Sequence, residues 1–178
     1  MNLPARIHIV GAAGSGKTTL AQALARRTGA PVHDLDRVAY VGGASARRPL
    51  DQKLAEVAAI AAQPAWVTEG IYLWWIDDLL RGADLIVWLD PPWRVAAWRI
   101  VRRHLLASWR GTNLHPGLVR LWRFVRRQRR YHTNRRPPPA APDDDGATTR
   151  QRTEQALAAY AGKLVRCRSP RDIRRIIR

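Results

Sequence analysis

The sequence predicts an α/β fold in which a parallel β-sheet is covered by helices on both faces. Short apolar segments alternate with segments of helical length, which is typical of parallel sheets with crossover helices. A glycine-rich loop joins the first apolar segment to the first helical one. The chain has 178 residues, of which 46% are hydrophobic, enough for the core of one domain. We therefore expect residues 1–178 to form a single domain.

Five strands are expected where apolar residues cluster between turn signals. They comprise residues 6–10, 31–36, 66–68, 84–89 and 164–168. The expected helices comprise residues 17–28, 51–62, 93–107, 115–132, 153–161 and a terminal helix that begins at 170. Gly29 is expected to end the first helix, and Asp51 to cap the second. Residues 42–49 are expected to form a loop, and residues 137–149 a turn-rich, flexible segment.

The charge of the chain predicts an anionic partner. Its 31 basic and 14 acidic residues give a net charge of +17, and all but three of the basic residues are arginine. This balance favours binding to a nucleotide, a nucleic acid or a lipid surface. The single cysteine, Cys167, excludes an internal disulfide and fits a reducing cytoplasm, and the scattered histidines do not indicate a zinc site. The first ten residues do not resemble a signal peptide and the apolar runs are short, so we expect a soluble, cytoplasmic protein.

Residues 11–18 (GAAGSGKT) match the Walker A motif, G-x-x-x-x-G-K-[ST], completely. The glycines allow backbone N–H groups to surround a phosphate, and the following helix directs its positive dipole end toward it. Lys17 is expected to reach the β- and γ-phosphates of ATP, and the Thr18 hydroxyl to ligate Mg²⁺. The expected nucleotide-binding residues are Gly11, Gly14, Ser15, Gly16, Lys17, Thr18 and Thr19.

Few carboxylates are placed to act on an acceptor. Asp34 and Asp36 lie near the end of the second expected strand, where their spacing would put both on one face. Glu69 ends the third strand, beside Gly70. A helix cap or a turn is the alternative role for each of them. Asp90 follows the fourth strand, but Pro91 and Pro92 come next, so a structural role is favoured there.

These residues resemble those of the adenylate-kinase-like P-loop kinases and, among them, the group known as DNA topology modulation proteins. The resemblance rests on the phosphate loop and on residues 34–36 (DLD), 66–72 (WVTEGIY), 85–91 (LIVWLDP) and 99–103 (RIVRR). It implies a P-loop NTPase three-layer sandwich with a five-stranded parallel sheet, an arginine-rich helical lid at about 99–136 and a flexible segment at about 137–150. It also implies an ATP-dependent kinase that transfers the γ-phosphate to a small acceptor such as a nucleoside or nucleotide.

The resemblance further implies roles for individual residues. Arg99 and Arg103 would enter the lid and stabilise the transferring phosphoryl group, and the alternative lid residues are Arg102, Arg126, Arg127, Arg129 and Arg130. The expected catalytic residues are Lys17, Asp36, Glu69, Arg99 and Arg103. The expected acceptor-binding residues are Asp34, Asp36, Glu69, Gly70 and Tyr72, and the loop at 168–170 would border adenine.

One departure concerns the acceptor. Adenylate kinases carry an arginine soon after an Asp-Gly pair, whereas Glu69-Gly70 here is followed by no arginine until Arg81. Only Arg37, Arg47 or Arg48 could take over that role. The acceptor therefore stays unidentified at this stage.

The arginine-rich segment also supports a second function class. Residues 91–142 contain 13 arginines and no acidic residue. A basic amphipathic helix at 116–132 could be a lid helix, a nucleic-acid-binding helix or an anchor on anionic lipid. The alternative function is thus a nucleic-acid-binding P-loop ATPase. Among the tryptophans, Trp66, Trp88 and Trp98 are expected in the core, and Trp74 and Trp75 could stack on a planar substrate.

Overall fold

The computed structural model describes residues 4–43, 46–113 and 117–177, and these contain the predicted parallel sheet. Its strands are β1 (Arg6–Gly11), β2 (Val32–Asp34), β3 (Trp66–Gly70), β4 (Leu85–Leu89) and β5 (Leu164–Cys167). Their spatial order is β2-β3-β1-β4-β5, and every neighbouring pair is parallel. The carboxyl ends of all five strands therefore meet at one edge, where open α/β sheets bind their ligands.

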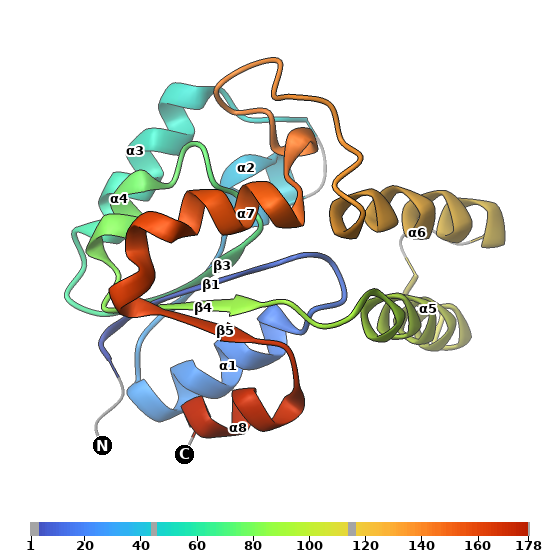
Figure 1. Cartoon of the computed structure of the whole chain (residues 1–178), viewed down its shortest axis with the longest axis horizontal. Helices are drawn as coiled ribbons and strands as arrows, with labels where there is room; N and C mark the ends of the chain where they lie inside the picture. The colour runs from blue at the N-terminus through green and yellow to red at the C-terminus, as the bar shows by residue number, and fades with distance from the viewer. Residues whose placement is uncertain (1–3, 44–45, 114–116, 178) are drawn as a thin grey trace.

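Helices cover both faces of the sheet, as the alternating pattern predicts (Figure 1). The α-helices are α1 (Lys17–Thr28), α2 (Leu35–Ala39), α3 (Leu50–Ala61), α4 (Asp77–Gly82), α5 (Trp93–Trp109), α6 (Leu118–His132), α7 (Arg150–Leu157) and α8 (Pro170–Ile177). Short 3₁₀ helices are η1 (Val41–Gly43), η2 (Asp145–Ala147) and η3 (Ala158–Lys163). Helices α1 and α8 lie on one face, and α2, α3, α4 and α7 lie on the other. The α/β three-layer sandwich is confirmed.

Each face of the sheet has its own apolar core, because successive strand residues point to opposite faces. Ile7 and Ile9 of β1 pack with Leu20 and Leu24 of α1 on one side. On the other side the core contains Trp66 and Trp88 together with side chains of α2, α3, α4 and α7. Both tryptophans are buried, as predicted. This body of β1–β5 with α1–α4, α7 and α8 is called the sheet domain below.

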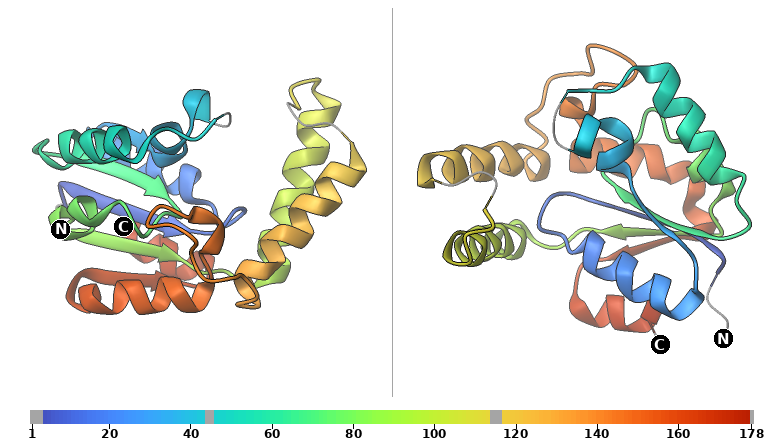
Figure 2. Two further views of the ribbon diagram at one scale, coloured as in Figure 1. Left: turned by 90° about the horizontal axis from the view of Figure 1, so that it is seen from above. Right: turned by 180° about the vertical axis from the view of Figure 1, so that it is seen from behind.

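Helices α5 and α6 form a hairpin that projects from the sheet domain (Figure 2). Its root is packed: the Trp93 ring lies 5.2 Å from the ring of His132, and Tyr131 is buried. The Tyr131 hydroxyl donates to Thr153 of α7 and accepts from the Trp88 indole. The part of the chain expected as a lid is thus anchored to the sheet domain at its root, through contacts of Trp93, Tyr131 and His132. No described helix has both the length and the apolarity needed to cross a lipid bilayer.

Several predicted boundaries were wrong. The second strand ends at Asp34, because the Asp34 carboxylate accepts the backbone N–H of Asp36 and so starts α2. Asp36 consequently lies in a helix rather than in extended chain, and the two carboxylates do not share a strand face. Pro49, not Asp51, precedes α3, and the short helix α4 was not predicted at all.

Other differences concern the later helices. Helix α5 continues to Trp109, and α7 begins at Arg150 because the Thr149 hydroxyl accepts the N–H of Arg152. Helix α6 is described from Leu118, and residues 115–116 of its expected range lie outside the described residues. Trp98, expected in the core, is 62% exposed because α5 belongs to the hairpin that projects from the sheet domain.

Asp90 has the structural role that was favoured for it. Its buried carboxylate accepts hydrogen bonds from the guanidinium groups of Arg150 in α7 and Arg166 in β5. The Arg166 guanidinium also stacks on the Trp88 ring, 3.9 Å from its centroid. Asp90 thereby ties β4 to β5 and α7.

The acidic end of the segment expected to be flexible contacts the sheet domain. Asp143 accepts from the fully buried ammonium of Lys53 in α3, at 2.5 Å. Asp145 accepts from the Trp75 indole at 3.0 Å. Burial raises the pKa of Asp145 to about 6, against the lowering effect of the Trp75 hydrogen bond and of Lys53. Trp75 is therefore a core residue bound to this segment rather than a side chain free to stack on a substrate.

Candidate active site

The phosphate loop links the carboxyl end of β1 to the start of α1. Gly14 and Gly16 have φ angles of 77° and 101°, which favour glycine. A Cβ on Gly14 would also lie 2.5 Å from the Ala96 carbonyl oxygen of α5. Helix α1 begins at Lys17, so its first free N–H groups point into the loop. The loop thus has the conformation and the dipole that phosphate binding requires.

Two loop residues have roles that the motif alone did not reveal. A Cβ on Gly11 would lie 2.6 Å from the Leu89 carbonyl oxygen, so this glycine is needed for packing against β4. The Ser15 hydroxyl is buried and has no hydrogen-bond partner within the described residues. A buried unpaired hydroxyl is costly unless a ligand oxygen or water satisfies it, and this fits the phosphates of a nucleotide.

Glu69 holds the two principal side chains of the motif. The Thr18 hydroxyl donates to Glu69 Oε1 at 2.5 Å, and Lys17 Nζ lies 3.8 Å from Glu69 Oε2. Burial raises the pKa of Glu69, while the positive charge of Lys17 and the Thr18 hydrogen bond oppose this rise. Glu69 therefore lies beside the phosphate loop and links the loop to the carboxyl end of β3.

Asp36 is held by a tyrosine from the segment after β3. The Tyr72 hydroxyl donates to Asp36 Oδ1, and burial together with the Asp36 charge raises the pKa of Tyr72. Tyr72 is only 2% exposed and does not line the cavity described below. It therefore holds Asp36 from outside the cavity, which differs from the acceptor-binding role expected for it. Gly70 does not line the cavity either, and a Cβ on it would meet the Tyr72 ring at 2.8 Å.

Arg99 and Arg103 reach the site from the root of the hairpin. Arg99 Nη1 donates to the Ser15 carbonyl oxygen at 2.8 Å, which ties α5 to the phosphate loop. Arg103 lies one turn further along and is exposed. Both arginines line the cavity, whereas Arg126, Arg127, Arg129 and Arg130 do not. Arg99 and Arg103 are therefore better placed than the later cluster to contact a phosphoryl group.

These groups surround a cavity of about 760 Å³ at the carboxyl edge of the sheet. Its lining includes the predicted residues Gly14, Ser15, Gly16, Lys17, Thr18, Thr19, Asp34, Asp36, Glu69, Arg99 and Arg103. Sequence reasoning missed Phe124 of α6 and both Ile173 and Ile177 of α8. The i, i+4 spacing of the two isoleucines could have indicated an apolar wall. Residues 168–170, expected to border adenine, are not in the lining.

The oxygen groups of the site could share a metal ion with a bound phosphate. The described residues contain no cluster of three or more His, Cys, Asp or Glu side chains that could bind a metal alone. The Thr18 hydroxyl and the Glu69 carboxylate are adjacent oxygen groups, which Mg²⁺ prefers, and a phosphate would supply the others. His8 of β1, whose ring is hydrogen-bonded to the Thr68 hydroxyl, is neutral, because burial and the charge of Lys17 lower its pKa to about 3.

Comparison with known proteins supports the fold. A family model described as isopentenyl transferase matches residues 5–72, less than half of the chain. No significant match to a curated protein was found. A gluconokinase from Sinorhizobium meliloti 1021 has 18% identity and a TM-score of 0.57 over 99% of this chain and 89% of its own. A shikimate kinase from Bacteroides thetaiotaomicron has 15% identity and a TM-score of 0.45 over 97% and 94%.

The likeness to the gluconokinase supports the predicted P-loop kinase architecture, and at this identity it shows the fold alone. The TM-score of the shikimate kinase is too low to add to it. Membership of the group of DNA topology modulation proteins is not shown by these matches.

Proposed function

We propose that this chain is a cytoplasmic ATP-dependent kinase of the adenylate-kinase-like class, which transfers the γ-phosphate of ATP to a small acceptor. One observation carries the proposal: a complete Walker A loop shares a cavity with carboxylates from two strand ends and with two arginines of a projecting hairpin. This combination supplies phosphate binding, a group to orient a hydroxyl and cations for the transferring phosphoryl group. The relationship to the DNA topology modulation group belongs to the same proposal.

The phosphate loop and Glu69 would bind the nucleotide. Lys17 and the loop N–H groups would contact the phosphates, and the Ser15 hydroxyl would gain a partner there. Thr18 and Glu69 would hold Mg²⁺, which neutralises charge on the β- and γ-phosphates when bound. The hydrogen bond between Thr18 and Glu69 supports this role, because it brings both oxygens within 2.5 Å of each other.

Asp36 and the arginines would act on the transferred group. The Tyr72 hydroxyl occupies one oxygen of Asp36, which leaves the other to accept the proton of an acceptor hydroxyl. Arg99 and Arg103 would neutralise charge that develops on the phosphoryl group, as a guanidinium does well because it stays ionised. Asp34 would assist in binding the acceptor, for which a nucleoside or nucleotide is our first choice.

Domain organisation enters the proposal as well. Residues 1–178 would act as one kinase-like domain with a lid at about 99–136. The alternative function, a nucleic-acid-binding P-loop ATPase using the basic helix at 116–132, rests on charge alone. The cavity, by contrast, brings Asp36 and Glu69 to the phosphate loop, which nucleic-acid binding does not require.

A screen for ADP release stimulated by small hydroxyl compounds tests the proposal. At least one nucleoside, nucleotide or other metabolite should raise ATP turnover in the wild-type protein. Lys17→Ala should abolish that turnover while the circular-dichroism spectrum is preserved. Lys163→Ala is the matched control, because Lys163 donates to carbonyl groups of α4 and the turn after it, outside the cavity. Turnover that persists in Lys17→Ala would contradict the proposal.

A further inference from the structure

The far end of the hairpin carries an unusual number of exposed apolar side chains. Trp109 is the last residue of α5 and Leu118 the first of α6, and they are 83% and 72% exposed. Leu105 and Trp122, about one turn further from the connection, are 53% and 59% exposed, and Val119 is 63% exposed. We call these five residues the apolar tip. Figure 2 shows that this end of the hairpin lies away from the sheet domain.

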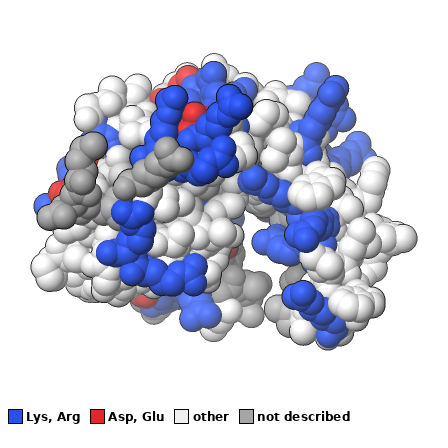
Figure 3. Space-filling model, turned by 90° about the horizontal axis from the view of Figure 1, so that it is seen from below, with Lys and Arg blue, Asp and Glu red and all other residues white. Residues whose placement is uncertain are grey.

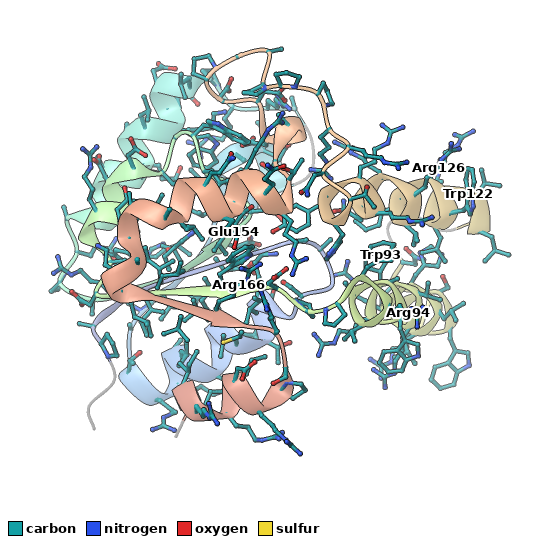
Figure 4. The ribbon with its side chains drawn as sticks, in the orientation of Figure 1. Trp93, Arg94, Trp122, Arg126, Glu154 and Arg166 are labelled. Atoms are coloured by element: carbon teal, nitrogen blue, oxygen red, sulfur yellow. The ribbon has the colours of Figure 1, made fainter. Side chains whose placement is uncertain are left out.

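Arginines surround the apolar tip. The exposed rim arginines are Arg102, Arg110, Arg120, Arg123 and Arg126. The Arg126 guanidinium stacks on the Trp122 ring at 5.2 Å, and both lie on the outer surface of α6 (Figure 4). Because residues 91–142 include no acidic side chain, the rim has no carboxylate of its own segment to pair with. Figure 3, which views the molecule from below, shows basic and uncharged side chains interleaved over the hairpin on the side of α5 as well.

We propose that the apolar tip inserts into the interfacial region of an anionic lipid bilayer while the rim arginines bind the lipid phosphates. Tryptophan is favoured at the membrane interface, where the indole ring is buried and its N–H stays near polar headgroups. Arginine can extend its charged end to the headgroups while its stem stays in apolar surroundings. Apolar insertion and charge attraction together give the two signals that stable peripheral binding needs.

The composition of the apolar tip favours lipid over a nucleic acid. Nucleic acids bind arginine and can stack on tryptophan, but Leu105, Leu118 and Val119 would gain little from phosphates or base faces. A bilayer removes all three from water. Binding to lipid would therefore bury the exposed apolar side chains of the tip, whereas binding to a nucleic acid would leave them in water.

Charge also disfavours a second copy of this chain as the occupant. Two apolar tips in contact would bring two arginine rims together, each without acidic residues in its own segment. A chain with a net charge of +17 repels another copy, whereas a surface of anionic lipid attracts it. Charge complementarity thus selects the lipid.

Membrane binding through the apolar tip would leave the candidate active site open. None of the five tip residues lines the cavity, which receives Arg99, Arg103 and Phe124 from the hairpin. The inference consequently does not depend on the proposed kinase activity, and substitutions at the tip can be tested separately from catalysis.

Co-sedimentation of the full chain with vesicles tests the inference. The wild-type protein should bind vesicles of phosphatidylcholine with phosphatidylglycerol, bind phosphatidylcholine alone weakly, and lose affinity as salt is raised. The double variant Trp109→Ser/Trp122→Ser should lower the apparent partition coefficient at least about tenfold, because both interfacial anchors are lost. Trp98→Ser is the matched control, since Trp98 is also exposed but lies near the root, and it should keep most of the binding.

Quenching by lipids with brominated acyl chains distinguishes insertion from adsorption by charge. Tryptophan fluorescence of the wild type and of Trp98→Ser should be quenched, and that of the double variant much less. Binding that is equal in the double variant, or absent in the wild type, would overturn the inference. So would a tip-dependent dimer, or tip-dependent binding to duplex or single-stranded oligonucleotides without binding to vesicles.

Discussion

The sheet domain and the hairpin use the same two residue types in opposite ways. In the sheet domain, Trp66 and Trp88 are buried, and Arg150 and Arg166 share one carboxylate. In the hairpin, the tryptophans at 98, 109 and 122 are exposed, and the arginines occupy a segment without acidic residues. Tryptophan and arginine therefore build structure in one region and present a surface in the other.

The same residue type therefore has a different role according to its place in the fold. A tryptophan on a strand is surrounded by helices on both faces, so it is buried whatever the function. A tryptophan on a hairpin that is packed only at its root stays exposed unless another molecule covers it. The hairpin root joins the two regions, because Arg99 binds the phosphate-loop backbone there.

The largest expected effect concerns the carboxylates of the cavity. Asp36→Asn should lower kcat by about 100- to 10,000-fold, the range found for general bases. Glu69→Gln should have a comparable effect, since it would weaken both the position of Thr18 and the oxygen set for Mg²⁺. Steady-state kinetics with the identified acceptor, together with equilibrium ATP binding, would measure this. A wild-type rate in either variant would remove that residue from the proposed machinery.

The tryptophans themselves offer the second test. Trp66→Ala should lower the free energy of unfolding by about 3–5 kcal/mol, because it opens a cavity in the core. Trp98→Ala should change it by less than about 0.5 kcal/mol, because the side chain is mostly in water. Urea denaturation followed by circular dichroism would measure both. A large loss of stability in Trp98→Ala would mean that this face of α5 is covered in solution.

The arginines of the hairpin should also fall into two groups, one that acts in phosphoryl transfer and one that acts in surface binding. Arg99→Ala and Arg103→Ala should each lower kcat by about 10- to 1000-fold, since one arginine remains near the phosphoryl group. Replacing Arg126, Arg127, Arg129 and Arg130 together should barely alter kcat. It should weaken binding to anionic lipid without abolishing it, because only Arg126 of these belongs to the rim and the apolar tip stays intact. Single-turnover phosphoryl transfer would measure the first effect. The reverse pattern would place the lid contacts on α6.

The free energy of unfolding should depend on pH through the buried carboxyl group of Asp145, in contrast to the exposed charges of the hairpin. Its ordinary pKa of 3.8 is raised to about 6 in the folded chain, so the folded state binds the proton more tightly. The contribution of Asp145 to the free energy of unfolding is therefore greatest at low pH, and it is lost as the pH rises from about 4 to about 6. Asp145→Asn should become more stable relative to wild type over that interval, by up to about 3 kcal/mol. Urea titrations at several pH values would measure the difference, and a constant difference would contradict it.

Much of the sheet domain was predictable from the sequence because its signals are local. The Walker A motif fixes a strand, a loop and a helix together, and the apolar run before Asp90 is a strand wherever the chain places it. Helix α4 was missed because its six residues carry too little periodicity. Asp36 was misplaced because the hydrogen bond from its N–H to Asp34 was not considered.

The remaining parts of the site depend on contacts between distant segments. Nothing near Tyr72 in the sequence indicates that its hydroxyl would bind Asp36. Phe124 and Ile173 enter the cavity from helices whose placement depends on the whole fold. The exposure of Trp98 was likewise decided by where the hairpin projects. Residue types were therefore easier to predict than the side chains they would meet.

The ion pairs of Asp90 also change how the net charge of this protein should be understood. Arg150 binds both oxygens of that carboxylate through its Nε and Nη2 atoms, a planar arrangement that lysine cannot reproduce. Some arginines, such as Arg150 and Arg166, are thus paired with a carboxylate inside the folded chain. Because Asp90 is already counted in the net charge of +17, these pairs leave that sum unchanged, but they make its distribution uneven: the hairpin presents arginines from a segment without acidic residues. Exchange of Arg150 for lysine should therefore lower the free energy of unfolding although the net charge is unchanged, because lysine cannot donate both hydrogen bonds to Asp90.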